Sequence, residues 1–364
     1  MENNKIKVGI THGDINGIGY ETILKTLEDP RIAEICTPVV YGSAKIAAHY
    51  RKLLELPEVS LTRIDDASQA TGPDRNYIIN VVGEDVMPEP GKCTPAGGQA
   101  ALAALERAVA DLNAGLIDVL VTCPISKDAI HSEEFNFPGH TEFLEARLSP
   151  DGSVGSDGSD KAMMIMAGER LRVALVTIHE PLSAVSADIT AERITESISR
   201  FASSLIADFG IHKPRIAVLS LNPHAGDNGV IGREDTEIVT PAIEEAYRKR
   251  ILAFGPYPAD GFFGSGAYRK FDGVLAMYHD QGLIPFKIIE GEHGINYTAG
   301  LSKVRTSPDH GTAFDIAGKG TADPQSLREA IYAALDIYRA RQREAEATAN
   351  PLRRQNFDRG RGND

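Results

Sequence analysis

KIKVGITHGDINGIGYETILKTL, residues 5–27, decides the class of fold, because an apolar β-branched run is followed by a glycine-rich turn and a segment of helical period. Lys5–Thr11 predicts a buried strand, and Tyr20–Leu27 predicts a helix. The glycines between them permit a tight turn, although their spacing is not GxGxxG. Strand, turn and helix in this order form the unit from which α/β sheets with parallel strands are built.

The same alternation continues along the chain. Leu102, Leu105, Val109 and Leu112 form one stripe of a helix predicted over Ala100–Asn113. Further runs are apolar enough for strands covered on both faces: Ile117–Thr122, Arg172–Ile178, Arg215–Leu221 and Gly273–Tyr278. The sequence therefore predicts an α/β fold with a largely parallel sheet. A chain of 364 residues, 42% of them hydrophobic, is long enough for two lobes.

Composition excludes several classes of protein. A formal net charge of −13 argues against a nucleic-acid or anionic-membrane binder, since these need basic surfaces. Cys36, Cys93 and Cys123 show neither a disulfide pattern nor zinc-ligand spacing, and no run is long enough to span a bilayer. A cytoplasmic protein is expected. Residues 150–160 predict a surface loop without a function, and residues 346–364 a flexible tail or a basic contact for a partner.

Three histidines directly follow apolar runs. His179 follows RVALVTI, His224 follows RIAVLSLNP, and His279 follows GVLAMY. Ligand sites of open parallel sheets lie at the carboxyl ends of the strands, so these imidazoles are candidate ligands of a divalent metal such as zinc, cobalt or manganese. The alternative is that each caps a strand or binds a loop carbonyl, and His12 after KVGIT shows how easily the pattern arises.

Acidic residues near these histidines have two interpretations. Asp280 directly follows His279, and Asp260 lies in PYPADGFF before the same predicted strand. Either carboxylate is suited to complete a metal shell or to orient an imidazole. The alternative is an ordinary turn or helix cap. Asp14 in the first glycine turn is open to a structural or a catalytic role.

Polar residues after His279 form a candidate anion site. Lys287, Asn296 and Arg305 supply two charges and an amide that suit a phosphate, although each cation alone is more typical of a solvated surface. His140 and Thr141 in NFPGHTEF precede a helical segment, where the threonine is suited either to bind an anion or to cap the helix.

Six motifs carry a family resemblance. GDINGIGYE (13–21), FPGHTEF (137–143), VTIHEPL (176–182), LNPHAGDNG (221–229), MYHDQGL (277–283) and RTSPDHGTAFDIAGKG (305–320) are similar, in order and spacing, to those of the 4-phosphohydroxythreonine dehydrogenases. The resemblance covers about residues 5–340. It implies a homodimer whose active site lies at the interface, with metal ligands from both subunits. By residue, it implies three metal ligands, His179, His224 and His279; five substrate-binding residues, His140, Thr141, Lys287, Asn296 and Arg305; and three catalytic candidates, His140, Lys287 and Asp280.

The stretch from Asp309 to Pro324 also resembles the adenosine-binding loop of isocitrate and isopropylmalate dehydrogenases. This likeness implies two α/β/α lobes flanking a central cleft: residues 1–130 with 300–345, and residues 131–299 with the metal and dimer contacts. No extra arginine pair for a 2′-phosphate is evident, which favours NAD over NADP. The residues implied to bind the dinucleotide are His310, Gly311, Thr312, Ala313, Asp315 and Gly318.

The resemblance implies a reaction. One divalent metal per site (Zn, Mg, Mn or Co) acidifies a substrate hydroxyl, hydride passes to the nicotinamide, and the β-keto acid loses CO2 to give 3-amino-2-oxopropyl phosphate. Ile15 and Tyr20 replace prolines that are common in the family's first loop, so Asp14 receives no catalytic role. The nearest alternative is D-threonate or D-erythronate 4-phosphate dehydrogenase. Another class of function would be a metal-dependent phosphatase or a phosphometabolite sensor.

Overall fold

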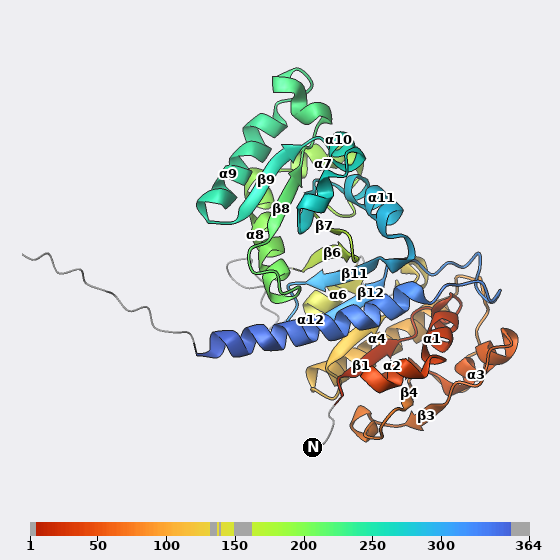
Figure 1. Cartoon of the computed structure of the whole chain (residues 1–364). Coiled ribbons are helices and arrows are strands. Elements are labelled where there is room, and N and C mark those ends of the chain that lie inside the picture. The colour runs from red at the N-terminus through yellow and green to blue at the C-terminus, as the bar shows by residue number, and fades with distance from the viewer. Residues whose placement is uncertain (1–4, 132–136, 138–139, 149–161, 351–364) are drawn as a thin grey trace, which may run out of the picture.

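The first strand–turn–helix unit of the computed structural model has the predicted form (Figure 1). Strand β1 (Lys7–Thr11) leads through a turn into helix α1 (Gly19–Leu27). Gly13 has a positive φ of 69°, and a side chain there would collide with the carbonyl of Pro124, so only glycine fits. The structure describes residues 5–131, 137, 140–148 and 162–350, with the side chains of residues 140 and 142 left out. The predictions for the 150–160 loop and the end of the tail lie outside this part.

The described residues form a sheet of 12 strands in the order β3-β4-β2-β1-β5-β12-β11-β6-β7-β10-β8-β9. Eight of its pairings are parallel. The three antiparallel ones, β12 with β11, β11 with β6, and β6 with β7, lie together at the centre and reverse the strand direction between the two ends. The other strands are β2 (Thr37–Gly42), β3 (Leu61–Ile64), β4 (Asn76–Asn80), β5 (Val119–Thr122), β6 (Met163–Ala167), β7 (Arg172–Leu175), β8 (Arg215–Leu219), β9 (Leu252–Tyr257), β10 (Gly273–Ala276), β11 (Ile295–Ala299) and β12 (Val304–Pro308).

Helices cover both faces of this sheet, and the α/β prediction is confirmed. Buried side chains of α1, α3, α8, α9 and α12 pack on one face of the sheet. On the other face, those of α4 and α6 pack against the half that contains β2, β4 and β5, and those of α10 and α11 pack against the half that contains β7, β8 and β10. The bounds are α2 (Pro30–Ile35), α3 (Ala44–Leu53), α4 (Pro95–Asn113), α5 (Lys127–Ile130), α6 (His140–Leu148), α7 (Leu182–Asp188), α8 (Ala191–Ala207), α9 (Thr240–Arg248), α10 (Ala259–Gly264), α11 (His279–Glu290) and α12 (Gln325–Ala349). Short helical turns are η1 (Ala67–Gln69), η2 (Pro223–Gly229), η3 (Asp235–Val239), η4 (Ala267–Lys270) and η5 (Gly291–His293).

Helix α4 shows how local sequence sets an element. It begins earlier than the predicted Ala100, because Thr94 is an N-cap whose hydroxyl accepts a hydrogen bond from the Gly97 amide, and Pro95 fits the first helical position. The predicted end at Asn113 is confirmed. Within the described part of the chain, no helix is both long and apolar enough to cross a membrane.

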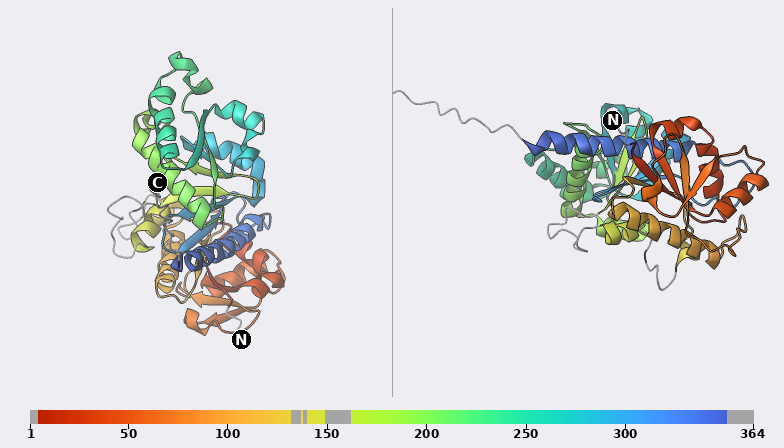
Figure 2. Two further views of the ribbon diagram at one scale, coloured as in Figure 1. Left: turned by 60° about the vertical axis from the view of Figure 1, so that its left-hand side comes forward. Right: turned by 90° about the horizontal axis from the view of Figure 1, so that it is seen from below.

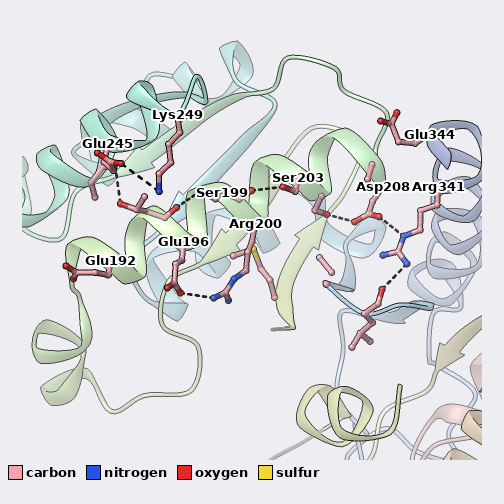
Figure 3. Close-up of a pocket in the computed structure, with 18 of the residues that line it drawn as sticks. Glu192, Glu196, Ser199, Arg200, Ser203, Asp208, Glu245, Lys249, Arg341 and Glu344 are labelled. Atoms are coloured by element: carbon pink, nitrogen blue, oxygen red, sulfur yellow. Dashed lines mark hydrogen bonds and ion pairs between the residues drawn. The ribbon is translucent and has the colours of Figure 1, made fainter. Parts of the chain in front are cut away.

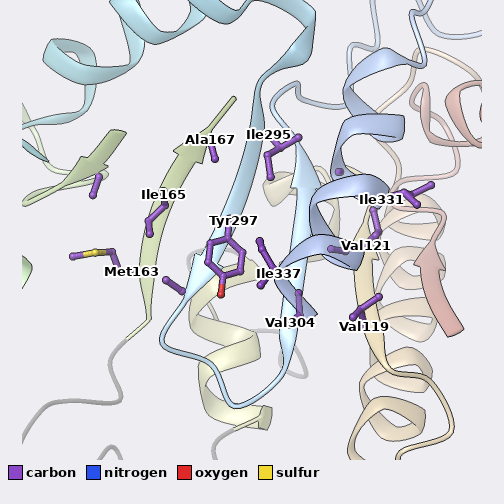
Figure 4. Close-up of a cluster of buried hydrophobic side chains, with 14 of the residues drawn as sticks. Val119, Val121, Met163, Ile165, Ala167, Ile295, Tyr297, Val304, Ile331 and Ile337 are labelled. Atoms are coloured by element: carbon purple, nitrogen blue, oxygen red, sulfur yellow. The ribbon is translucent and has the colours of Figure 1, made fainter. Parts of the chain in front are cut away.

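The central strands present two different faces, because successive side chains of a strand point to opposite sides. Figure 4 shows the apolar face, on which Ile165, Ile295, Tyr297 and Val304 pack near residues of α12. The alternate residues include Asn296, which is paired in register with Met166 of β6 and Ser307 of β12. The second face of the central strands is therefore partly polar.

The two ends of the sheet form an upper and a lower half in Figure 1 and in the left view of Figure 2, with α12 lying across the junction. Strands β11 and β12 connect the halves at the centre of the sheet. The predicted lobe boundaries near residues 130, 300 and 345 stay predictions.

Candidate active site

A pocket of about 300 Å³ lies over the polar face of the central strands. Its residues come from both halves of the sheet and from the segments after β5, β7, β10 and β12. Eight of the residues predicted to form the site line it: Thr141, His179, His279, Lys287, Asn296, Arg305, His310 and Gly311. The sequence analysis missed its other lining residues, namely Thr122, Pro124, Ile125, Lys127, Met164, Met166, Ile178, Leu283, Ser307, Pro308 and Asp309.

Arg305 is the buried cation of this pocket. Only 2% of the residue is exposed. Its Nε and Nη2 atoms donate to Thr122 Oγ1 at 3.0 and 2.5 Å, and Nη1 donates to Thr298 Oγ1 at 2.9 Å. No carboxylate within the described residues forms an ion pair with it. Burial lowers the pKa of Arg305 to about 9, so the charged guanidinium is in an environment that calls for an anion.

Two further polar atoms of the pocket are buried without a hydrogen-bond partner in the described chain. They are Asn296 Oδ1 and His310 Nε2. His310 Nδ1 is 3.0 Å from the Gly311 carbonyl, so in the neutral ring the Nε2 atom is an acceptor. Burial lowers the pKa of the His310 imidazole, which favours that neutral form. Buried polar groups are rarely left unpaired, so these atoms mark places where a ligand can bind.

Lys287 and Asp309 form an ion pair at the pocket. The Lys287 ammonium donates to the backbone carbonyl of Asp309 at 3.2 Å. It also lies 3.3 Å from the carboxylate Oδ1 atom of Asp309. The lysine is half exposed, while the carboxylate is largely buried. Burial raises the pKa of the Asp309 carboxyl, and the nearby ammonium opposes that rise. The prediction named Lys287 but not Asp309, which directly follows β12.

Two of the three predicted metal ligands lie together. The rings of His179 and His279 have centroids 5.9 Å apart, from the segments after β7 and β10. His279 Nδ1 is 2.8 Å from Asp280 Oδ1, which leaves Nε2 for a metal and agrees with the interpretation that Asp280 orients an imidazole. His224 does not line the pocket, and the described residues of one chain hold no group of three or more His, Cys, Asp or Glu side chains suited to a metal.

His224 lies in a backbone segment of unusual conformation. Six consecutive residues, 224–229, have positive φ angles, and only Gly226 and Gly229 among them are glycines. Left-handed backbone costs roughly 1–2 kcal/mol for a residue with a side chain. The turn is held by the buried Asp235, whose carboxylate accepts from the amides of Leu221 and Asn222. The imidazole of His224 is exposed on this turn.

The remaining polar candidates near strand ends lie outside the pocket lining. His12 is fully buried and stacks on Tyr20 with centroids 5.2 Å apart, so it is a core residue. Asp14 Oδ1 accepts from the Asn16 amide at 2.9 Å, a local turn contact that agrees with the structural interpretation of this loop. Asp260 is an exposed residue of the first turn of α10.

The predicted dinucleotide loop begins at the pocket and continues along α1. His310 and Gly311 line the pocket, whereas Thr312, Ala313, Asp315 and Gly318 do not. The Thr312 carbonyl accepts from the Ile18 amide at 3.1 Å, and Ala313 and Gly318 have positive φ angles of 45° and 76°. His140 begins α6, but its side chain lies outside the described part, so its predicted role is not tested.

A larger cavity of about 1020 Å³ lies elsewhere, between α8, α9 and the end of α12 (Figure 3). Many of its charges are already paired with each other. Arg200 binds Glu196 at 2.9 Å, and Arg341 binds Asp208 at 2.7 Å. This contrasts with the unpaired Arg305, so the smaller pocket is the better candidate for binding a charged substrate.

Comparison with known proteins identifies the family. The family model described as "Pyridoxal phosphate biosynthetic protein PdxA" matches residues 34–334. The chain belongs to the PdxA family. A 4-hydroxythreonine-4-phosphate dehydrogenase from Bacteroides thetaiotaomicron is 54% identical over 358 residues, which are 98% of this chain and 96% of that protein. The resemblance seen in the six motifs is thereby confirmed.

Solved structures support the PdxA assignment. A crystal structure of 4-hydroxythreonine-4-phosphate dehydrogenase from Klebsiella pneumoniae is 34% identical, with a TM-score of 0.77 over 92% of this chain and 99% of that chain. A terephthalate 1,2-cis-dihydrodiol dehydrogenase from Burkholderia xenovorans is 27% identical, with a TM-score of 0.57, covering 91% and 98% of the two chains. The PdxA fold is thus shared with a second dehydrogenase.

Proposed function

We propose that this PdxA-family protein catalyses the NAD-dependent oxidation of 4-phosphooxy-L-threonine, followed by decarboxylation to 3-amino-2-oxopropyl phosphate, in pyridoxal 5′-phosphate biosynthesis. The names of its relatives support this reaction. The observation that carries the proposal is the buried Arg305 guanidinium, unpaired by any described carboxylate, in a pocket of about 300 Å³. A pocket of that size suits a small phosphorylated metabolite.

The substrate phosphate binds at Arg305, Lys287 and Asn296 in this proposal. The guanidinium is already oriented by two threonine hydroxyls, so little side-chain freedom is lost on binding. The Asn296 amide adds a neutral donor. Holding the far end of a small substrate fixes the position of its reacting carbon, which is the usual function of a remote phosphate clamp. Thr141 of α6 lines the same pocket and is assigned to the substrate as well.

NAD binds along residues His310–Gly318. Backbone groups of this loop hold the adenosine part, and the unpartnered His310 Nε2 atom accepts a hydrogen bond from the cofactor or from a bound water. The loop begins at the pocket, so a dinucleotide running from it brings the nicotinamide toward the substrate. We assign NAD, with NADP as the alternative.

The metal site is proposed to combine residues from two subunits. His179 and His279 of one subunit fit the same cation, because their rings face one region and Asp280 leaves His279 Nε2 available. His224 of the second subunit completes the site. A divalent metal such as Zn²⁺, Mg²⁺, Mn²⁺ or Co²⁺ would supply Lewis-acid chemistry, acidifying the substrate hydroxyl and polarising the later ketone.

Exposed apolar side chains support a homodimer around this site. Val230, next to the strained turn that carries His224, is 81% exposed, and Ile288 on α11 is 79% exposed. Ile231 beside the same turn, Ile284 on α11 and Leu182 at the start of α7 are also exposed. Apolar groups exposed beside a candidate site are typical of a subunit interface. We propose that this surface, defined by these five residues, contacts the second subunit.

The protein side chains then perform three tasks in the reaction. The clamp orients the substrate so that hydride leaves C3 toward the nicotinamide while the hydroxyl proton passes to a base, for which His140 is proposed. Asp280 keeps the His279 ring in its ligand orientation. After CO2 loss, Lys287 Nζ donates a proton to C2 of the enolate, and Asp309 keeps that nitrogen at the pocket. His140 is assigned to the same proton transfers.

The deciding experiment compares three substrates. The purified protein is mixed with NAD⁺, a divalent metal and either 4-phosphooxy-L-threonine, D-threonate 4-phosphate or D-erythronate 4-phosphate, and NADH formation is followed by absorbance. We expect the highest kcat/KM with 4-phosphooxy-L-threonine. A higher value with either acid phosphate would establish the alternative substrate. Release of inorganic phosphate, or binding without any NADH, would instead indicate a phosphatase or a sensor.

The proposed location is the cytoplasm. Cys36 and Cys123 are buried and Cys93 is exposed, and all three are free thiols. Free cysteines are typical of a reducing compartment.

A further inference from the structure

Helix α1 holds both ends of the loop after β12. Near the start of the loop, the Ile18 amide donates to the Thr312 carbonyl at 3.1 Å. Near its end, the Lys25 ammonium donates to the carbonyls of Gly320 at 2.9 Å and Ala322 at 2.7 Å. Residues 312–322 are thus attached to α1 at two separate places.

Glu21 completes the second attachment. Its Oε1 atom accepts from the Ala322 amide at 2.8 Å and from the Lys25 ammonium at 2.8 Å. Glu21 and Lys25 are separated by one helical turn, so both point to the same side of α1. The ammonium has three hydrogens, and these three acceptors (Glu21, Gly320 and Ala322) use all of them.

The burial of this pair distinguishes it from an ordinary surface ion pair. The Glu21 side chain is fully buried, and the Lys25 side chain is 18% exposed. A buried charge is costly unless it is paired and hydrogen-bonded. Glu21 Oε1 is compensated by Lys25 and the Ala322 amide, and Lys25 by the loop carbonyls, while Glu21 Oε2 has no partner among the described residues. Ile18 adds an apolar contact, because it packs in one cluster with Ala317 and Ala322. The loop's conformation therefore depends directly on α1.

We propose that Lys25 and Glu21 are positioning residues for dinucleotide binding: they fix the loop 312–322 in the conformation that receives the cofactor. The proposal rests on the NAD-dependent function above. Neither residue lines the substrate pocket, and the ammonium has no free hydrogen for a ligand. Their removal weakens cofactor binding and leaves phosphate-substrate binding almost unchanged.

The test is Lys25→Met in the full-length protein, since methionine keeps much of the side-chain volume but cannot donate to the two carbonyls. NAD⁺ affinity is measured by calorimetry, and hydrogen–deuterium exchange is measured on peptides covering 312–322 in the absence of ligand. We expect the Kd for NAD⁺ to rise about tenfold, which is about 1.4 kcal/mol, and the loop amides to exchange faster. The KM of the phosphorylated substrate should change less than about twofold, which is under about 0.4 kcal/mol.

Two further variants separate positioning from folding. Lys25→Arg retains donors for the carbonyls and should recover most of the NAD⁺ affinity. Arg200→Met removes an ion pair with the same one-turn spacing on α8, in which Arg200 lies 2.9 Å from the more exposed Glu196 (Figure 3), and should alter neither NAD⁺ binding nor loop exchange.

Several outcomes would overturn the inference. One is unchanged NAD⁺ affinity in Lys25→Met. Another is an equal loss of cofactor and substrate affinity together with faster exchange throughout the protein, which would show a general folding role. If the wild-type protein itself bound no NAD⁺, the proposed function would fail, and the inference with it.

Discussion

Arg305→Met should change the stability of the protein and its affinity for the substrate to different extents. Burial lowers the pKa of Arg305 to about 9, a depression equivalent to roughly 5 kcal/mol against the charged form. Three hydrogen bonds from the charged guanidinium to Thr122 and Thr298 offset most of this cost, at about 1.5 kcal/mol each. Removing the cation therefore changes the unfolding free energy of the ligand-free protein by less than about 2 kcal/mol.

Substrate binding responds much more strongly. A guanidinium can bind phosphate through two charge-assisted hydrogen bonds, and their loss costs roughly 3 kcal/mol, or about 100-fold in KM. Urea unfolding gives the stability, and steady-state NADH formation gives KM. Arg305→Lys retains the charge but not the planar fork, so its KM should lie between those of wild type and Arg305→Met.

Arg172→Met is the matched control, because Arg172 is another largely buried arginine. It lies over the Phe209 ring at 5.0 Å and does not line the pocket. Its replacement should leave KM unchanged. The reasoning would be refuted if Arg305→Met lost more than about 2 kcal/mol of stability, or if it bound the substrate normally.

Three other predictions follow from burial, exposure and the shared site. Burial lowers the pKa of the His12 imidazole to about 3, so the neutral ring stabilises the folded protein above the pKa that it has in the unfolded chain, and this stabilisation is lost as the pH falls toward 3. The wild-type protein should therefore lose stability between pH 7 and pH 5, and His12→Phe should lose about 2 kcal/mol less over this range, as measured by urea unfolding. Ile288→Glu should shift the protein toward monomers in sedimentation, whereas Tyr247→Glu, at a residue 65% exposed on α9, should not. Inactive His179→Ala and His224→Ala proteins, once their subunits are exchanged, should regain about a quarter of wild-type activity, because half of the dimers then carry one intact site; no recovery would exclude a shared site.

The sequence predicted five strands of the described sheet. β1, β5, β7, β8 and β10 are continuous apolar runs, and the structure contains a strand within each predicted range. The other seven strands, β2, β3, β4, β6, β9, β11 and β12, were missed, although β2, β6 and β12 are buried along their whole length. In β11, Ile295, Tyr297 and Ala299 alternate with polar residues, a pattern typical of a strand with one polar face, so this signal was available. The methionine-rich β6 has no such alternation and contains one β-branched residue, Ile165.

The candidate site was predictable where residue type and motif coincide. Arg305, Asn296 and Lys287 line one pocket as the anion prediction requires, although their functional roles stay proposals. Thr122 and Asp309 were missed, since a threonine ending a strand or an aspartate after one is common in turns. Their importance depends on Arg305 and Lys287, which are 183 and 22 residues away along the chain. Sequence spacing alone does not reveal such pairs.

The reversal at the centre of the sheet explains why the pocket lies there. Three successive antiparallel pairings turn the strands of one half against those of the other, while α12 covers the back of the central strands. The helices on the front belong to the separate halves, α4 and α6 to one and α10 and α11 to the other, so the central front face is left for a pocket. Arg305 places a charge here without a counter-ion among the described residues, and Asn296 Oδ1 and His310 Nε2 are buried acceptors without a donor. An unpaired buried polar group costs about 1–3 kcal/mol, and a bound anion at Arg305 together with hydrogen-bond donors of substrate or cofactor at the two acceptors would remove that cost.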